Sequence, residues 1–121
     1  MKIYRGRRTD DGCVVTVEGN NRRGQGYVHV LPLRLDLWNH SPAGFEWGYG
    51  GSGPAQLALA ILADHLGHDR EAVRLHQSFK FQVVVTLPRE GWTLTSAQVE
   101  RGIEESYPLG ANRESEMRGS L

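Results

Sequence analysis

Residues 44–63 read GFEWGYGGSGPAQLALAILA and decide the fold of this chain. They predict a short aromatic strand at 45–47, a glycine turn, and a helix that begins near Gly53 with a proline at its first position. Ser52 is the expected helix cap, and Gln56 is placed to reach back towards it. The helix is apolar almost all round, and such a helix is usually buried on more than one side. We therefore expect this junction at the centre of the molecule.

The length and composition are those of one globular domain. The chain has 121 residues, of which 39% are hydrophobic and 23% charged, and its formal net charge is zero. We expect a single α+β domain over residues 1–108 and a disordered, polar tail over residues 109–121. No apolar run reaches the roughly 18 residues of a membrane span, and no secretory signal is visible. A single cysteine, Cys13, allows no internal disulfide, so the cytoplasm is the expected compartment.

The N-terminal half has the pattern of short β-strands. Residues 2–18 have the pattern of a β-hairpin: residues 2–6 alternate polar and apolar side chains, residues 13–17 are largely β-branched, and an Asp-Gly pair at 11–12 lies between them. Further alternating runs predict strands at 27–31 and 34–37, before the strand at 45–47. These patterns predict a small N-terminal antiparallel sheet of four or five strands.

The C-terminal half has the pattern of helices. The first helix ends at Gly67, which suits a left-handed cap. The second begins near Asp69 and runs to about Leu87, because Pro88 is a natural stop. The alternative is a helix that breaks near Ser78 into a strand, since the run that follows is β-branched.

A third helix follows a connector. Residues 89–94 are expected to be a connector that folds Trp92 and Leu94 back onto the core. Thr95 and Gln98 have the spacing of a capping box, which predicts a helix start. The complete pattern predicts an α+β fold, in which the sheet packs on about three helices.

The glycine turn carries the most suggestive chemical motif. Residues 48–53 match G-x-G-x-x-G between a strand and a helix, where backbone N–H groups can hold a phosphate. A dinucleotide fold also needs a second strand that ends in an acidic residue, and a P-loop needs Gly-Lys-Ser/Thr; the sequence has neither. The turn is interpreted first as structural and second as an anion or ligand site. That site would comprise Gly48, Tyr49, Gly50, Gly51, Ser52 and Gly53.

Other catalytic and metal motifs are weaker. Ser52 lacks the second glycine of a nucleophile elbow, and no large α/β sheet is predicted to carry its partners. His65 and His68 have no cysteine or second histidine pair to complete a tetrahedral set. We therefore predict no catalytic residue, no metal site and no cofactor.

Charge is distributed unevenly along the chain. Residues 1–34 contain seven basic and three acidic side chains. The adjacent arginines in the loop at 19–26 are interpreted as solvated surface residues, with a phosphate-contacting finger as the alternative. The candidate contacts for a protein or nucleic-acid partner are Arg5, Arg7, Arg8, Arg22, Arg23 and Trp47.

Several segments resemble a known family. They are FEWGYGGSGPAQLA at 45–58, Tyr4-Arg5-Gly6, Phe79-Lys80, Leu87-Pro88 and Trp92-Thr93-Leu94-Thr95. Together they are similar to the bacterial and phage family catalogued as domain-of-unknown-function family 6166, over about residues 2–106. The resemblance implies a small cytoplasmic protein of bacteria, phages or mobile elements. It supplies no activity, cofactor or site residue.

Three hypotheses about function follow. The first is a small non-enzymatic binding or accessory protein that contacts protein or nucleic acid. The alternative is a phosphate- or nucleotide-binding protein, or a small enzyme, that uses residues 48–53 at a helix N-terminus. The third is a structural protein that oligomerises and buries its exposed aromatic side chains.

Overall fold

The structure is a computed structural model that describes residues 1–107. Its elements are, in chain order, β1 (Ile3–Thr9), β2 (Gly12–Asn20), β3 (Gly26–Val30), α1 (Ser52–Leu66), α2 (Asp69–Gln82), the 3-10 helix η1 (Val84–Thr86), β4 (Gly91–Thr95) and α3 (Ser96–Glu105). The predicted α+β class, with an antiparallel sheet and three helices, is confirmed. The tail expected at 109–121 lies outside the described residues.

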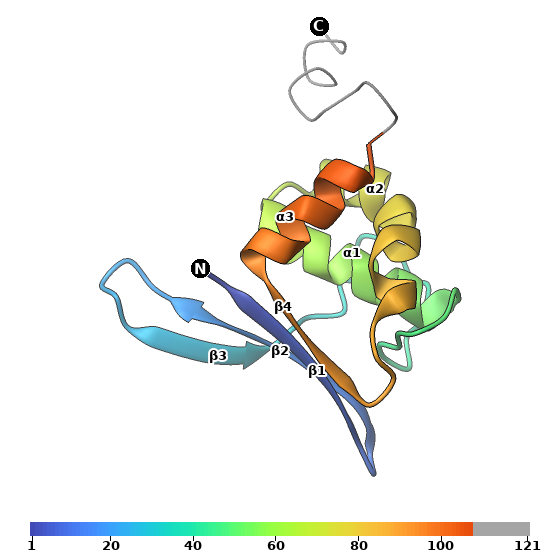
Figure 1. Cartoon of the computed structure of the whole chain (residues 1–121), viewed down its shortest axis with the longest axis horizontal. Coiled ribbons are helices and arrows are strands. Elements are labelled where there is room, and N and C mark those ends of the chain that lie inside the picture. Colours follow the sequence, from blue (N-terminus) through green and yellow to red (C-terminus); the bar gives the residue numbers. More distant parts are fainter. Residues whose placement is uncertain (108–121) are drawn as a thin grey trace, which may run out of the picture.

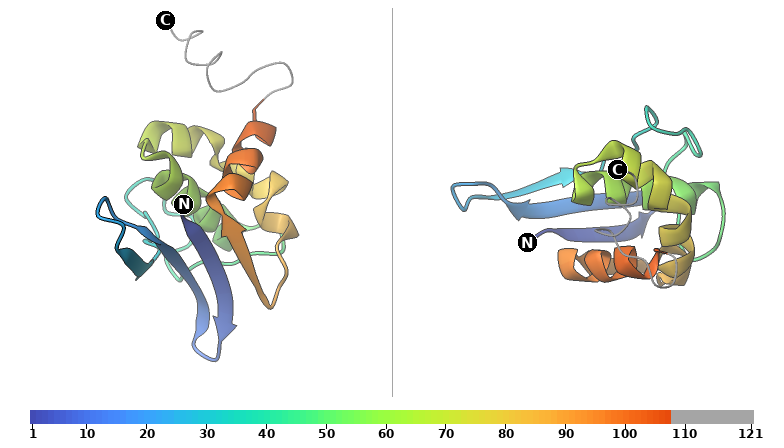
Figure 2. Two further views of the ribbon diagram at one scale, coloured as in Figure 1. Left: turned by 60° about the vertical axis from the view of Figure 1, so that its left-hand side comes forward. Right: turned by 90° about the horizontal axis from the view of Figure 1, so that it is seen from above.

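Four antiparallel strands form the sheet, in the order β3-β2-β1-β4 (Figure 1). The predicted hairpin of β1 and β2 is present, and Gly12 in its turn has a φ of 120°, which favours glycine. Alternate side chains of three strands are buried in the core, namely Tyr4, Val15, Val17, Trp92 and Leu94. The helices lie on this side of the sheet (Figures 1 and 2), and the other face is left open.

Helix α1 is the centre of the core, as its apolar sequence predicted. Every residue from Gly53 to Ala63 is buried, and α1 packs closely against α2. Gly67 ends the helix with a φ of 62°, also as predicted. The start differs from the prediction, because Gly51 is the N-cap and Ser52 is the first helical residue. Ser52 therefore does not cap the helix.

Two predicted strands are not strands in the structure. Residues 45–47 are irregular and pack against the start of α1, where a Cβ on Gly53 would lie only 2.6 Å from the Cβ of Glu46. Residues 34–37 form a turn, and Arg34 has a φ of 59°, which is incompatible with a strand. Alternation over three or four residues was too short a pattern to distinguish a strand from a packed loop.

Helix α2 is shorter than predicted. It ends at Gln82 and η1 follows, so both the continuous helix to Leu87 and the alternative strand are wrong. The three valines at 83–85 lose side-chain freedom in a helix, which favours an early end. The carbonyl of Val84 accepts the backbone N–H of Gly48, and this bond ties the glycine turn to η1.

The segment predicted as a connector contains strand β4, which pairs with β1 along its length. Trp92 and Leu94 are buried, as predicted. Thr95 and Gln98 form the predicted capping box at the start of α3. Among the helices of residues 1–107, none is long and apolar enough to cross a membrane.

Candidate ligand-binding surface

One buried side chain, Gln56, fixes the loop between β3 and α1. Its Nε2 donates to the carbonyl oxygens of Leu33 and Trp38, at 2.7 and 3.0 Å. Its Oε1 accepts from the backbone N–H groups of His40 and Ser41, at 2.8 and 3.0 Å. The amide therefore uses its full hydrogen-bonding capacity to hold the loop on α1. The sequence suggested that Gln56 reaches back to the helix start, and that prediction is wrong.

Two histidines meet beside this loop. Nε2 of His40 lies 2.9 Å from Nε2 of His76, and Nδ1 of His76 lies 2.6 Å from the carbonyl oxygen of Val73. Because a carbonyl can only accept, Nδ1 of His76 carries the proton and its Nε2 accepts from His40. Burial is the largest cause that lowers the pKa of both rings, and the charge of Lys80 also lowers the pKa of each. Both histidines are therefore neutral at pH 7.

Lys80 extends from α2 into the same cluster. The residue is only 9% exposed, and its Nζ lies 4.4 Å from the ring centre of Phe81. Within residues 1–107, no carboxylate pairs with this ammonium group, whereas the other lysine, Lys2, binds Asp64. No neighbouring carboxylate of residues 1–107 therefore balances the positive charge of Lys80. An anion that binds beside Lys80 would balance it.

Three aromatic side chains are half-exposed here, one on the loop, one on the glycine turn and one on α2. Trp38 is 52% exposed, Tyr49 50% and Phe81 63%. The ring of Trp38 stacks on His40, with centres 5.3 Å apart and planes inclined by 6°. It also lies 5.9 Å from the ring of His76, which connects it to Lys80. We define the aromatic–lysine surface as Trp38, His40, Tyr49, His76, Lys80 and Phe81.

The glycine turn forms one border of the aromatic–lysine surface. Gly50 lies against the ring of Phe81, and a Cβ on Gly51 would come within 2.7 Å of the ring of Tyr49. The absence of side chains at these two positions lets the aromatic rings approach the turn. The N-terminus of α1 begins at the same turn and attracts negative charge. Of the six residues predicted to bind an anion, only Gly53 is buried.

The predicted partner contacts on the sheet have different environments. Arg8 donates to both carboxylate oxygens of Glu46, at 2.8 and 2.7 Å, and lies over the ring of Trp47, which is 1% exposed. The hydrogen bonds from Arg8 are the main cause that lowers the pKa of Glu46 to about 2. Arg8 and Trp47 thus hold the segment at 45–47 against β1. Arg5 is paired with Glu18. The remaining predicted contacts, Arg7, Arg22 and Arg23, are exposed, the last two in the β2–β3 loop (Figure 1).

Sequence reasoning missed five residues of the aromatic–lysine surface and included only Tyr49. One usable signal was Phe81, a large apolar side chain that lies off the apolar stripe of its helix. The meeting of His40 with His76 had no signal, because it joins a loop to a helix. The burial of Lys80 likewise depends on tertiary packing.

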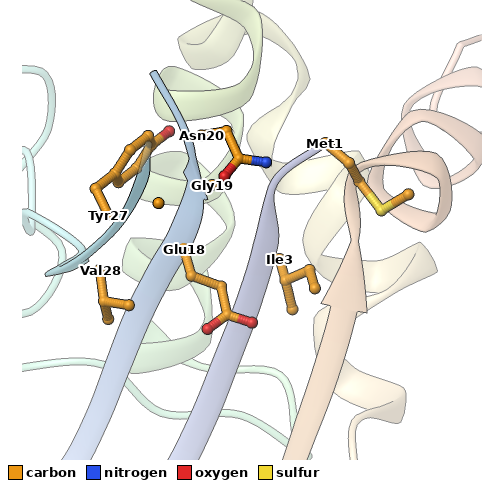
Figure 3. A pocket seen from close by; sticks show the side chains of 8 residues that line it. Met1, Ile3, Glu18, Gly19, Asn20, Tyr27 and Val28 are labelled. Atoms are coloured by element: carbon orange, nitrogen blue, oxygen red, sulfur yellow. The ribbon is translucent and has the colours of Figure 1, made fainter. Parts of the chain in front are cut away.

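A second exposed surface lies on the open face of the sheet. Ile3, Glu18 and Val28 are cross-strand neighbours there, at one end of a hollow of about 380 Å³. Figure 3 shows its lining, which comprises Met1, Ile3, Glu18, Gly19, Asn20, Gly26, Tyr27 and Val28. Because Glu18 is bound to Arg5, this corner is mainly apolar and without a free charge among its lining side chains.

Comparison with known proteins identifies the family of the chain. The model of a family of unknown function, DUF6166, matches residues 4–105. The chain belongs to the DUF6166 family. The match extends from β1 to α3 and includes every residue of the aromatic–lysine surface. The searches of curated proteins and of solved structures gave no significant match. Membership of DUF6166 therefore supplies no activity.

Proposed function

We propose that this DUF6166 protein is a non-enzymatic binding protein that holds single-stranded nucleic acid on its aromatic–lysine surface. The observation that carries the proposal is Lys80, a residue only 9% exposed whose ammonium group lies over an exposed phenylalanine ring and has no carboxylate partner within residues 1–107. Phosphate supplies the missing negative charge, and bases supply flat faces for the aromatic rings.

Lys80 is the proposed phosphate anchor. The side chain of Lys80 is packed, since the residue is only 9% exposed, so it loses less conformational entropy on binding a phosphate than an exposed arginine does. The charge of Lys80 acts on His40 and His76, which are neutral at pH 7 and do not compete for it. The backbone N–H groups at the start of α1 add partial positive charge at the border of the surface.

The exposed rings are the proposed base-stacking positions. Stacking of a base on an aromatic side chain contributes about 1–3 kcal/mol and depends little on the identity of the base. The loop that carries Trp38 is fixed by Gln56, and its ring is held flat on His40. Such a preordered ring loses little conformational entropy when a ligand binds.

A phosphate or mononucleotide on the glycine turn at residues 48–53 is the alternative ligand. Its phosphate chemistry is the same, so charge alone does not distinguish it from an oligonucleotide. Three exposed rings favour a ligand with several bases. An oligonucleotide that binds at least about tenfold more tightly than its mononucleotide supports the proposal, whereas equal affinities would assign the mononucleotide.

The resemblance also suggests a biological setting. A role in bacteria, phages or mobile elements fits a small accessory protein that binds single strands, since such elements expose them during replication and transfer. We include that accessory role in the proposal.

The test is a titration of labelled oligothymidine with the full chain, followed by fluorescence anisotropy at low and high salt. Lys80→Gln and Phe81→Ala should each weaken binding by about tenfold or more, because one removes the phosphate anchor and the other a stacking ring. Arg101→Gln is the matched control: it removes one positive charge from an exposed position on α3 and should change the affinity less than about twofold.

The same titration separates the remaining outcomes. Binding that Lys80→Gln and Phe81→Ala leave unchanged would place the nucleic acid elsewhere and overturn the proposal. The absence of a complex at low salt would overturn it as well. Thermal melting of each variant checks that the fold is retained, and melting of the wild type with inorganic phosphate or single nucleotides tests the alternative ligand.

A further inference from the structure

Strand β3 forms one edge of the sheet, and its outer side has unpaired backbone groups. The N–H of Leu31 donates to the carbonyl of Val15 at 2.9 Å. In an antiparallel ladder the residues that bond to the neighbouring strand alternate. With the observed register, this bond means that Tyr27 and His29 bond to β2. The backbone N–H and C=O groups of Val28 therefore point outward, away from β2, as do those of Val30.

This edge lacks the features that usually protect an edge strand. Residues 26–30 read GYVHV and contain no lysine, no proline and no acidic residue. Val28 and Val30 lie on the open face of the sheet, and they are 65% and 66% exposed. A neutral edge strand with exposed β-branched residues is suited to pairing with another strand. The opposite edge, β4, runs directly into α3, which lies on that side of the sheet (Figure 2).

We propose that β3 pairs antiparallel with β3 of a second copy, so that two sheets join into one across a twofold axis. In the pairing we assign, Val28 lies opposite the partner's Val30, and Val30 opposite the partner's Val28. These are hydrogen-bonded pairs, since all four residues direct their backbone groups outward. The four exposed valines then form one apolar row on the open face.

Two features of the chain favour a second copy over a foreign strand. The first is self-complementarity: a twofold axis brings the same two valines together from both copies, and neither strand carries a charge that repels the other. The second is the charge at the ends of the strand. Antiparallel pairing directs the loop with Arg22 and Arg23 towards the segment that follows β3 in the partner. There Arg34 is shared by Asp36 and Asp69, which leaves that cluster net negative.

The pairing also makes a prediction about the other face of the strand. His29 would lie opposite the partner's His29 in a non-hydrogen-bonded pair, where Cα atoms are about 4.5 Å apart. That separation lies within the range of a disulfide. A cysteine at position 29 should therefore cross-link two copies, whereas a cysteine at position 27 should not.

The first experiment is light scattering of the full chain over a range of concentrations. The expected result is a concentration-dependent shift from 13.5 kDa towards twice that mass. Val30→Lys should weaken the dimer by at least about tenfold, because lysine is a residue that prevents edge pairing. Thr93→Lys is the matched control, since it adds the same charge to the open face at the other edge, and it should leave the dimer intact.

The second experiment is mild oxidation of His29→Cys in a Cys13→Ser background, with Tyr27→Cys as its control. A disulfide-linked dimer for the first variant alone supports the assigned register. A monomer at every concentration would overturn the proposal, as would a dimer that Val30→Lys leaves unchanged or that does not cross-link through position 29. Because β3 carries no residue of the aromatic–lysine surface, these outcomes are independent of nucleic-acid binding.

Discussion

The aromatic–lysine surface and the β3 edge expose apolar side chains to a similar degree, but they offer different chemistry. Phe81 is 63% exposed and Val30 66%. Beside Phe81 lies the ammonium group of Lys80, on a helix whose backbone is hydrogen-bonded internally. Beside Val30 no charge lies on the strand, and its backbone groups point outward. Exposed apolar area alone therefore does not indicate which ligand each region would bind. The neighbouring charge and the presence of unpaired backbone groups distinguish the two proposals.

The two regions also depend on different supports. The loop of the aromatic–lysine surface is held by side-chain hydrogen bonds from one residue of α1. The β3 edge is held by the backbone ladder to β2 and needs no particular side chain. A variant that removes one support should therefore separate the two proposed interactions.

Gln56→Leu should have the largest effect. It keeps the approximate volume of the side chain but leaves two backbone N–H groups and two carbonyls of the loop without their partner. Each unsatisfied buried group costs about 1–3 kcal/mol, so we expect the free energy of unfolding to fall by about 3 kcal/mol or more. Urea denaturation followed by tryptophan fluorescence measures that fall.

The same variant tests the separation directly. In buffer without urea, where Gln56→Leu remains folded, oligothymidine binding should be lost because Trp38 and His40 are no longer held. The β3 dimer should persist in light scattering, because the ladder is unchanged. A fall in stability below about 1 kcal/mol would show that Gln56 does not fix the loop.

Local rules sufficed for the parts of the fold that a few consecutive residues determine. The turn at Gly12, the cap at Gly67 and the capping box at Thr95 were predicted, because each depends on the conformation or hydrogen bonds of adjacent residues. Strand β4 was missed because it exists through pairing with β1, at the other end of the sequence. Its five residues alone do not distinguish a strand from a connector.

The candidate surface was less predictable than the fold. Gln56 was expected to reach back to the start of its own helix, but its four partners lie 15 to 23 residues earlier in the chain. The sequence analysis made no prediction about Lys80, and only the packed structure shows that this residue is 9% exposed and has no carboxylate partner within residues 1–107. Polar side chains have several possible partners, and sequence spacing does not choose among them.

A change of pH should affect the aromatic–lysine surface next most strongly. The pKa of His40 and that of His76 are lowered, mainly by burial, so the folded protein binds fewer protons at these rings than the unfolded chain. The stability they contribute is present above the unfolded pKa of about 6.5 and is lost as the pH falls below it. The melting temperature should therefore fall between pH 7.5 and pH 5.5, and His76→Phe should reduce that fall.

The comparison of the wild type with His76→Phe isolates the contribution of the His40–His76 pair to the pH dependence. His76→Phe removes the titrating ring nearest Lys80, and the acidic groups common to both proteins cancel in the comparison. Equal losses of melting temperature in the wild type and the variant would contradict a role for the His40–His76 pair.

The smallest effect is expected from the double substitution Arg22→Ala and Arg23→Ala. Both arginines lie in the β2–β3 loop beside the β3 edge, away from α2 and the glycine turn (Figure 1). Oligothymidine affinity at low salt should therefore change less than about twofold, with a salt slope close to that of the wild type. The dimer should weaken a few-fold, because the loop loses its attraction to the partner's acidic cluster. A salt slope reduced by one or more would instead show that these arginines contact phosphate, and the nucleic-acid surface would then be the hairpin rather than the aromatic rings.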